Sequence, residues 1–193
     1  AINADSRTGG DGSNAINFLM AKTVDEANFY FEELSSKNNR RKDIELSMLE
    51  AALADASEQY YEKGMRGLSV YLPNGSHGIH GIVASRIKER FNCPVIVFSP
   101  SDVNEKDHPE RHITGSGRCI EELSIIDIVK KQILPVCPAI KAGGHPAAMG
   151  MTITLKQFPE FQKLFDVNVK KDSVDAGMND SDFYPTVKID HLI

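Results

Sequence analysis

The first part of the chain carries the hydrophobic pattern of one long helix. Thr23 supplies a hydroxyl group at the start of this segment and Glu26 supplies a carboxylate three residues later, the arrangement of a capping box. The residues that follow include no proline or glycine, and apolar side chains recur at helical spacing on both sides of a polar interval, 35–43. We predict a helix over 23–63 that connects two globular bodies and stops near Gly64. The polar interval is either a junction between two helices or an exposed middle.

After this helix the pattern changes to short apolar runs separated by helical segments. Continuous apolar runs bounded by glycine or proline are typical of buried strands. The predicted strands are 68–72, 94–98, 113–120 and 151–155, and the predicted helices are 82–91, 125–134 and 158–165. The charged segment 101–112 is predicted to be a loop, and the small and acidic segment 172–182 a linker. The expected fold class is α/β, preceded by the long helix.

Composition favours a globular protein with one main core. The chain has 193 residues, of which 41% are hydrophobic, and it lacks any apolar run of about 18 residues or more. A basic start followed by a short apolar stretch is also missing, so we expect a cytoplasmic protein that does not insert into a membrane. The three cysteines have no C-x-x-C spacing, which argues against a disulfide framework and a zinc site.

The net charge of −5 is unevenly distributed along the chain. The segment from Gln157 onward contains seven acidic residues and four lysines, which gives it a net charge of −3. The preceding part of the chain is therefore close to neutral. A near-neutral body can hold a local basic groove, but it predicts contact with few phosphates rather than a broad electrostatic surface.

Paired glycines, Gly143 and Gly144, followed by His145 form the most informative local pattern. Glycines let a backbone approach a ligand and expose N–H groups to an anion, and a histidine can add a hydrogen bond or a positive charge. On spacing alone, the structural alternative is a glycine-rich turn with a histidine at a helix start.

Ser116 and Arg118 are a second candidate for anion binding. Residues two apart on a strand point to the same face, so the hydroxyl and the guanidinium could reach one phosphate. The alternative is a glycine-kinked strand with a surface arginine.

Further polar groups lie at the start of the predicted helix 82–91 and near the start of the chain. Ser76 and His77 precede that helix, whose N-terminal amides could contact an anion, although a histidine there could also cap or pack. Arg7 lies in a polar stretch that belongs to no obvious element, where a solvated loop arginine is the plain interpretation.

Two other groups invite a metal-binding interpretation. They are Asp107 with His108 and His112 in the charged loop, and Asp190 with His191 near the end of the sequence. A dinuclear hydrolase needs several carboxylates and histidines that converge from rigid elements, so we interpret both groups as solvated surface and predict no metal site.

Taken in order along the chain, these pieces resemble the RecJ family of the DHH phosphoesterase superfamily. Residues 81–87 resemble the family's G-I-[VL]-A-S-R-[IL] helix, 115–118 its G-S-G-R segment and 143–150 its G-G-H-x-A-A-x-G motif. Residues 2–7 are similar to the I-N-A-x-G-R that closes the catalytic domain. The N-x-x-R-[KQ] pattern of the connecting helix is matched by Asn38, Arg41 and Lys42. The resemblance runs from about residue 2 to about residue 155.

The resemblance implies a metal-dependent 5′→3′ exonuclease that acts on single-stranded DNA in repair and recombination. Such an enzyme has a catalytic DHH domain with Mn or Mg ligands, a connecting helix and a small mixed-sheet DHH-associated domain. The resemblance therefore implies a division of this chain. Residues 1–22 are the end of the junction with the catalytic domain, 23–63 are the connecting helix and 64–170 are the DHH-associated domain. The remaining residues, 171–193, are a linker toward an oligonucleotide-binding barrel. No D-H-H triplet occurs in the chain, so we expect no catalytic or metal residue here and no hydrolysis by this chain alone.

Carried over by motif, the resemblance implies which residues hold the phosphates of a bound DNA end. These are Arg7, Ser116, Arg118, Gly143, Gly144 and His145, with further contacts expected from Ser76, His77, Asn38 and Arg41. The chain departs from the family in two places. Ser76 stands where the family usually has a histidine, with His77 one place late, and Ser6 replaces the glycine of I-N-A-x-G-R.

Three other interpretations remain open on the sequence, and the last of them is a structural domain whose glycines are incidental. The first is a DHH-type phosphoesterase that acts on short oligonucleotides or cyclic dinucleotides, which needs the same phosphate site but no track for a long strand. The second is a non-catalytic nucleic-acid-binding module. A D-H-H motif upstream in the reading frame would identify the chain as half of an enzyme.

Overall fold

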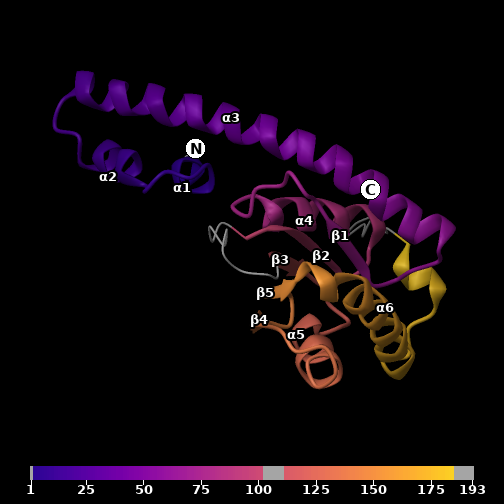
Figure 1. Cartoon of the computed structure of the whole chain (residues 1–193). Helices are drawn as coiled ribbons and strands as arrows, with labels where there is room; N and C mark the ends of the chain where they lie inside the picture. Colours follow the sequence, from indigo (N-terminus) through magenta and orange to yellow (C-terminus); the bar gives the residue numbers. More distant parts are fainter. Residues whose placement is uncertain (1, 102–110, 185–193) are drawn as a thin grey trace, which may run out of the picture.

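The chain forms an elongated helical arm and an α/β domain, and a single helix belongs to both (Figure 1). The computed structural model describes residues 2–101 and 111–184. Most of the predicted charged loop and the last nine residues lie outside the described residues, so the loop prediction is not tested.

The long helix α3 spans Val24–Ser57 and continues as a π-helix, η1, over Glu58–Glu62. At its start the Thr23 hydroxyl accepts a hydrogen bond from the Glu26 amide at 3.2 Å, and the Glu26 carboxylate accepts one from the Lys22 amide at 3.0 Å. The predicted long helix is confirmed. The polar interval is a continuous part of it, so the alternative of a junction between two helices is wrong.

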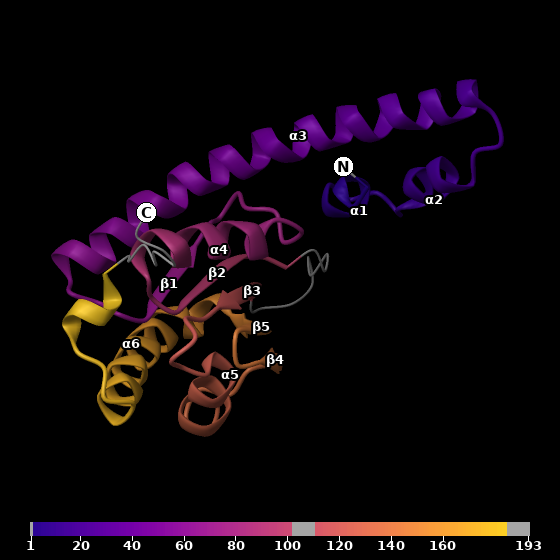
Figure 2. The ribbon, with the colours of Figure 1, turned by 180° about the vertical axis from the view of Figure 1, so that it is seen from behind.

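Two short helices, α1 (Ala4–Arg7) and α2 (Ser13–Met20), lie beside the first half of α3, whereas the α/β domain lies under the second half (Figures 1 and 2). The buried carboxylate of Asp5 binds the Lys37 ammonium group of α3 at 2.5 Å. This pair joins residues far apart in sequence, which explains why local pattern alone assigned the opening stretch to no element. Arg7 therefore lies on a helical turn rather than in a loop.

The sheet has five strands in the order β1-β2-β3-β5-β4. β1 and β2 are parallel, joined by the helix α4 (His80–Phe91), and every other neighbouring pair is antiparallel. The strands are β1 Leu68–Tyr71, β2 Val95–Pro100, β3 His112–Arg118, β4 Lys141–His145 and β5 Ala148–Thr154. The predicted mixed-sheet α/β fold is confirmed.

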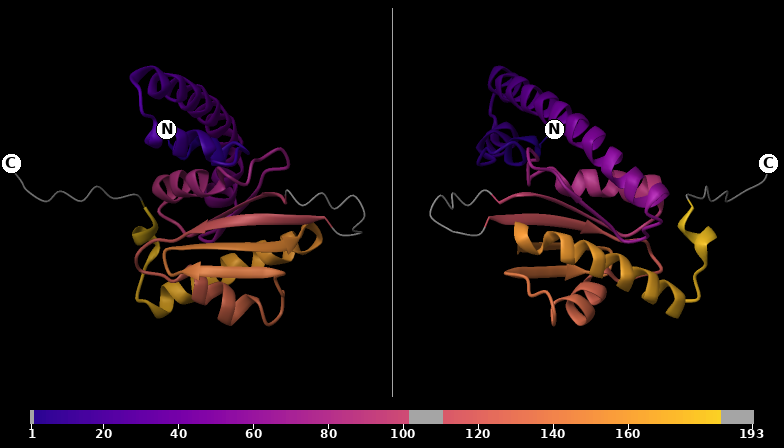
Figure 3. Two further views of the ribbon diagram at one scale, coloured as in Figure 1. Left: turned by 90° about the vertical axis from the view of Figure 1, so that its left-hand side faces the viewer. Right: turned by 45° about the vertical axis from the view of Figure 1, so that its right-hand side comes forward.

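Helices pack on both sides of the sheet. α3 and α4 lie on one side, and α6 (Phe158–Asp175) lies on the other together with α5 (Ile125–Asp127) and its π-helical continuation η2 (Ile128–Ile133). Figure 3 shows α6 behind the strands in its left view and in front of them in its right view. α4 covers only part of its side, so β4 and β5 have one face without a helix among the described residues.

The difference between a sheet face covered by helices and one without a helix is visible within β3, because its residues alternate between half-buried and buried. Ser116 and Arg118 are half-buried, whereas Gly115 and Gly117, which alternate with them, are buried. We call the face of β3, β5 and β4 that carries Ser116 and Arg118 the open face, and the face toward α5 and α6 the closed face.

The picture of this domain drawn from sequence was incomplete in two places. It included no strand at Gly143 and Gly144 and offered a glycine-rich turn as the structural alternative, but these residues form β4, which exists through pairing with β5 although glycine has low strand propensity. α6 extends to Asp175 rather than to residue 165, and so includes the beginning of the predicted linker. Its added length is stabilised by the buried Val169 and by Asp166, which accepts hydrogen bonds from the Arg66 and Gly67 amides. A short 3-10 helix, η4 (Asp180–Phe183), follows.

The cysteines form no disulfide, and all three are buried. Burial raises the pKa of the Cys93 and Cys119 thiols to about 12, which leaves them protonated and unreactive near neutral pH. No helix among the described residues is long and apolar enough to cross a lipid bilayer.

Candidate phosphate-binding cleft

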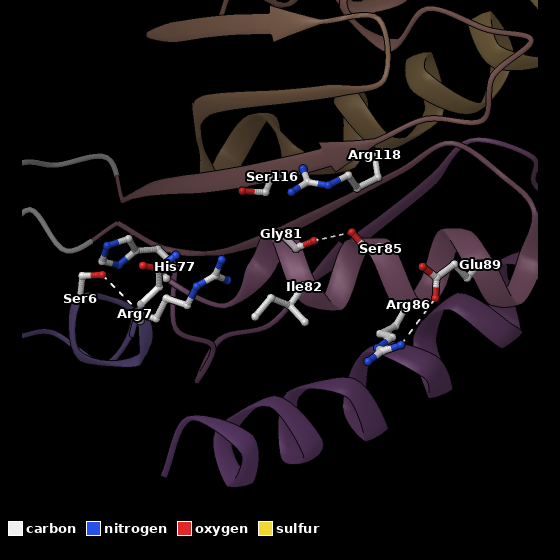
Figure 4. A pocket seen from close by; sticks show the side chains of 12 residues that line it. Ser6, Arg7, His77, Gly81, Ile82, Ser85, Arg86, Glu89, Ser116 and Arg118 are labelled. Carbon is white, nitrogen blue, oxygen red and sulfur yellow. Dashed lines mark hydrogen bonds and ion pairs between the residues drawn. The ribbon is translucent and has the colours of Figure 1, made fainter. Parts of the chain in front are cut away.

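A cleft of about 630 Å³ lies where α1, the start of α4 and β3 meet (Figure 4). It brings together residues from three separate parts of the sequence. Those that line it are Asn3, Ser6, Arg7, His77, Gly78, Gly81, Ile82, Ser85, Arg86, Glu89, Ser116 and Arg118. Four of the sequence-predicted site residues, Arg7, His77, Ser116 and Arg118, are therefore in one place.

Ser116 and Arg118 both project from β3 toward the first turns of α4 (Figure 4). The prediction that they share one face of a strand is confirmed. The alternating glycines on the closed face let the strand pack against apolar side chains there, while the polar groups remain on the open face.

Arg118 carries a positive charge that no carboxylate of the described residues neutralises. One of its nitrogens, Nη1, donates a hydrogen bond to the Gly117 carbonyl oxygen at 2.7 Å, and the side chain is half-buried. Burial, and secondarily the positive charge of Arg7, lower the pKa of the Arg118 guanidinium. Two cations that repel each other across one cleft are stabilised by an anion placed between them.

Two glycines make this arrangement sterically possible. A Cβ atom at Gly78 would lie 2.4 Å from the Arg7 carbonyl oxygen, and one at Gly81 would lie 2.7 Å from Nη2 of Arg118. The absence of side chains at these positions lets α1 and the Arg118 guanidinium approach the start of α4 from its two sides.

The two polar residues before α4 are placed differently. His77 is exposed and lines the cleft, although it stands one place late relative to the family pattern. Ser76 does not line it, and its amide donates a hydrogen bond to the Met48 sulfur at 3.3 Å.

His80, which sequence reasoning did not select, is buried behind this loop. Its Nε2 lies 2.8 Å from the Ser99 hydroxyl of β2. Burial, with a smaller effect from His77, lowers the pKa of His80 to about 4. The imidazole is therefore neutral near pH 7, and its contact with Ser99 joins the start of α4 to β2.

Asn38 and Arg41 line a neighbouring cleft of about 560 Å³ that shares Arg7 with the first. The Arg41 guanidinium donates hydrogen bonds to the Glu45 carboxylate and, at 3.0 Å, to the Asn38 side-chain oxygen. Because these partners neutralise and orient it, Arg41 acts in this structure as a brace within α3.

Gly143, Gly144 and His145 do not line the cleft, because they form the edge strand β4. Across the sheet Arg118 pairs with Ala148, and Ala148 pairs with His145. His145 therefore shares the open face with Arg118 at a distance of two strands, roughly 10 Å. It is exposed, and Pro146 and Ala147 make the turn that follows it.

Several lining residues were missed as site candidates although they lie in the quoted motifs. Ser85 and Arg86 follow Gly81 on α4, and Arg86 forms an ion pair with Glu89 at 3.7 Å. The helical spacing of Gly81 and Ser85, four residues apart, was the available signal for a shared face.

The described residues contain no group of three or more His, Cys, Asp or Glu side chains that could hold a metal ion. His112 begins β3, whereas Asp107, His108, Asp190 and His191 lie outside the described residues.

Comparison with known proteins identifies a matching family model, the DHHA1 domain, over residues 64–171. The chain is also similar to the single-stranded-DNA-specific exonuclease RecJ of Salmonella typhimurium and to that of Escherichia coli. Each is 35% identical over 158 residues, which make up 80% of this chain and 26% of the relative. The chain thus spans about a quarter of the length of these relatives.

Solved structures show the same similarity. RecJ from Thermus thermophilus in complex with Mg2+ has a TM-score of 0.72 and 26% identity, over 88% of this chain and 24% of that chain. An exonuclease RecJ bound to manganese has a TM-score of 0.71 and 26% identity, over 90% of this chain and 40% of that chain.

Proposed function

The chain belongs to the DHHA1 domain family and is RecJ-like, and from this premise we propose that it binds the phosphorylated end of single-stranded DNA. In this proposal it is the substrate-binding part of a 5′→3′ exonuclease. Arg7, Ser116 and Arg118 hold the terminal phosphate, and His77 lies beside it. Gly143 and His145, with the backbone of Gly144 between them, contact the bound strand farther along the open face.

One observation carries the proposal, which is that Arg7 and Arg118 face one cleft without a carboxylate partner among the described residues. A terminal phosphate monoester carries a charge of roughly −1.5 to −2 near pH 7, more than the single charge of a phosphodiester inside the strand. A pair of guanidinium groups matches this larger charge, and the Ser116 hydroxyl can donate a further hydrogen bond. The cleft is therefore suited to the end of a strand rather than to its interior.

The proposed task of this part of the protein is positioning. Fixing the terminal phosphate sets the distance from the end at which a phosphodiester can be cut, and orientation of this kind contributes strongly to catalysis. The Asp5–Lys37 ion pair holds α1, and with it Arg7, against the long helix.

We place hydrolysis itself outside this chain. RecJ structures have been determined with Mg2+ and with manganese, and metal-dependent cleavage needs converging ligands. The described residues do not offer such a set. We expect this chain alone to be inactive, with the metal ligands in a DHH domain of the same protein, located in the cytoplasm.

The test is a fluorescence-anisotropy titration of this chain with a single strand labelled at its 3′ end, carrying either a 5′-phosphate or a 5′-hydroxyl. We expect weak, salt-sensitive binding that favours the phosphorylated strand. Arg118→Ala should weaken binding of that strand about ten- to a hundredfold at low salt, because charge-assisted hydrogen bonds to the phosphate are lost.

The matched control is Arg90→Ala, which removes an exposed guanidinium of α4 that does not line the cleft. Equal affinity for the two strands, or equal losses in the two variants, would show that the cleft does not recognise the terminal phosphate. Strands of increasing length test the alternatives, because an oligonucleotide or cyclic-dinucleotide phosphoesterase gains nothing beyond a few nucleotides.

A further inference from the structure

The open face continues beyond the cleft as rows of residues that lie side by side across β3, β5 and β4. The register gives three rows, which are Arg118–Ala148–His145, Ser116–Gly150–Gly143 and Thr114–Thr152–Lys141. Successive rows are roughly 7 Å apart, because two residues of an antiparallel strand separate them. The first two rows contain residues to which the proposed function assigns DNA contacts, namely Arg118, Ser116, Gly143 and His145, whereas no residue of the third row takes part in that proposal.

The middle row leaves bare backbone next to Ser116. A Cβ atom added at Gly143 would meet no atom within 4 Å, and one at Gly150 would meet only the Gly115 carbonyl oxygen, at 3.9 Å. Gly144 is the opposite case, since a Cβ atom there would lie 2.4 Å from the Ala148 carbonyl oxygen. Packing inside the chain thus explains Gly144, but it does not explain why Gly143 and Gly150 lack side chains.

The third row combines two hydroxyl groups with a positive charge. The Thr114 and Thr152 hydroxyl oxygens are 3.3 Å apart, and one donates to the other, which leaves the second hydroxyl hydrogen for a further acceptor. Lys141 stands opposite Thr152 on the edge strand, is exposed, and forms no ion pair with a carboxylate of the described residues. Two hydroxyls beside an unneutralised ammonium group are suited to an oxyanion.

We infer that Thr114, Thr152 and Lys141 form a second anion subsite, which holds the phosphodiester that follows the terminal nucleotide. The first nucleoside lies flat over the bare backbone of Gly150 and Gly143, between the two phosphate subsites. This inference rests on the proposed function, which places the terminal phosphate at Ser116 and Arg118. The strands that carry these rows stand in front of α6 in the left view of Figure 3, where no helix of the described residues passes in front of them.

The experiment compares two ligands that differ by one nucleotide, 5′-phosphorylated thymidine and 5′-phosphorylated dithymidine, by calorimetric titration of this chain. The first variant is Lys141→Met, with Lys163→Met as matched control, because Lys163 is an exposed lysine of α6 on the other side of the sheet. The second is the double variant Thr114→Val with Thr152→Val, which removes both hydroxyls together and so leaves neither one unpaired.

For the wild type we expect the dinucleotide to bind several-fold more tightly than the mononucleotide. Lys141→Met and the double threonine variant should each remove most of this advantage, while mononucleotide binding and the control stay unchanged. The salt dependence of dinucleotide binding should also fall in Lys141→Met, by a slope of roughly 0.7, since one phosphate contact is lost.

Other outcomes distinguish failure of the second subsite from failure of the proposed function. If the dinucleotide has no advantage, or keeps it in both variants, the second subsite is wrong, even when Arg118→Ala still weakens both ligands. If Arg118→Ala leaves mononucleotide binding unchanged, or the wild type binds neither ligand, the proposed function fails and the second subsite fails with it.

Discussion

The two faces of β3 and β5 are made by alternate residues of the same short segments, yet they differ in almost every physical respect. On the closed face Gly115 and Gly117 lie against Phe98, Ile125 and Met149, with no room for a further atom. On the open face the same strands present hydroxyls, charges and bare backbone to solvent. The glycines of this strand pair therefore differ in their surroundings. At some positions packing leaves no space for a side chain, whereas at others no neighbouring atom would obstruct one.

This contrast shows where the sequence is constrained by folding and where it is free to serve a ligand. Changes on the closed face should cost stability, whereas changes on the open face should cost binding. Four substitutions or conditions test that division, in order of the expected change in the free energy of unfolding.

The largest effect is expected for Phe98→Ala. The Phe98 ring is fully buried and contacts the rings of Phe158 and Phe161, with centroids 5.5 and 5.6 Å away. Its removal should lower the free energy of unfolding by about 3–5 kcal/mol. Urea denaturation measures this, and a loss below about 1 kcal/mol would show that the closed face is not tightly packed.

The second test concerns His80, which is buried between α4 and the sheet near the cleft. The unfolded chain protonates a histidine near pH 6.5, whereas His80 in the fold has a pKa of about 4. The unfolded state thus binds more protons between these values, so stability is full above pH 6.5 and is lost as the pH falls toward 4, by roughly 3 kcal/mol.

The measurement is urea denaturation from pH 7 to pH 4.5 for the wild type, His80→Gln and His145→Gln. The first variant should lose part of the pH dependence, while the variant at the exposed His145 should retain it. Identical pH dependence in all three would mean that His80 is not the buried group that titrates.

The third test adds one methyl group to the closed face. A Cβ atom at Gly115 would lie 2.6 Å from two atoms of the Phe98 ring, so Gly115→Ala forces displacement in a packed core. We expect a loss of about 1–3 kcal/mol in the free energy of unfolding, measured by urea denaturation. An unchanged midpoint would contradict the packing described for this face.

The smallest change in stability is expected when the same methyl group is added to the open face. Gly143→Ala meets no atom within 4 Å, so stability should stay within about 0.5 kcal/mol or rise slightly. Binding of 5′-phosphorylated thymidine should nevertheless weaken severalfold, because the methyl group would occupy the surface on which we propose that the nucleoside lies. Unchanged binding together with unchanged stability would show that the nucleoside does not contact this part of the open face.

Sequence pattern anticipated most of the fold because its signals were local. The long helix followed from the capping residues at Thr23 and Glu26, and β2 from its continuous apolar run. Strand β4 was missed because glycine-rich segments form strands only when a neighbour pairs with them, and the extension of α6 was missed because Asp166 satisfies backbone amides about a hundred residues away.

The site was anticipated unevenly for the same reason. The shared face of Ser116 and Arg118 follows from the alternation of one strand and needs no tertiary information. The meeting of Arg7 with Arg118, the burial of His80 and the bracing of Arg41 by Glu45 depend on how distant elements pack. The third row on the open face depends on strand register, which the sequence does not reveal.

The central claim is that the open face, from the cleft across β3, β5 and β4, is where the nucleic acid binds. A crystal structure of this chain with 5′-phosphorylated dithymidine tests it most directly. We predict the terminal phosphate within hydrogen-bonding distance of Ser116 and Arg118, and the second phosphate beside Thr152 and Lys141. A dinucleotide bound elsewhere, for example along the basic residues 40–42 of α3, would contradict the account.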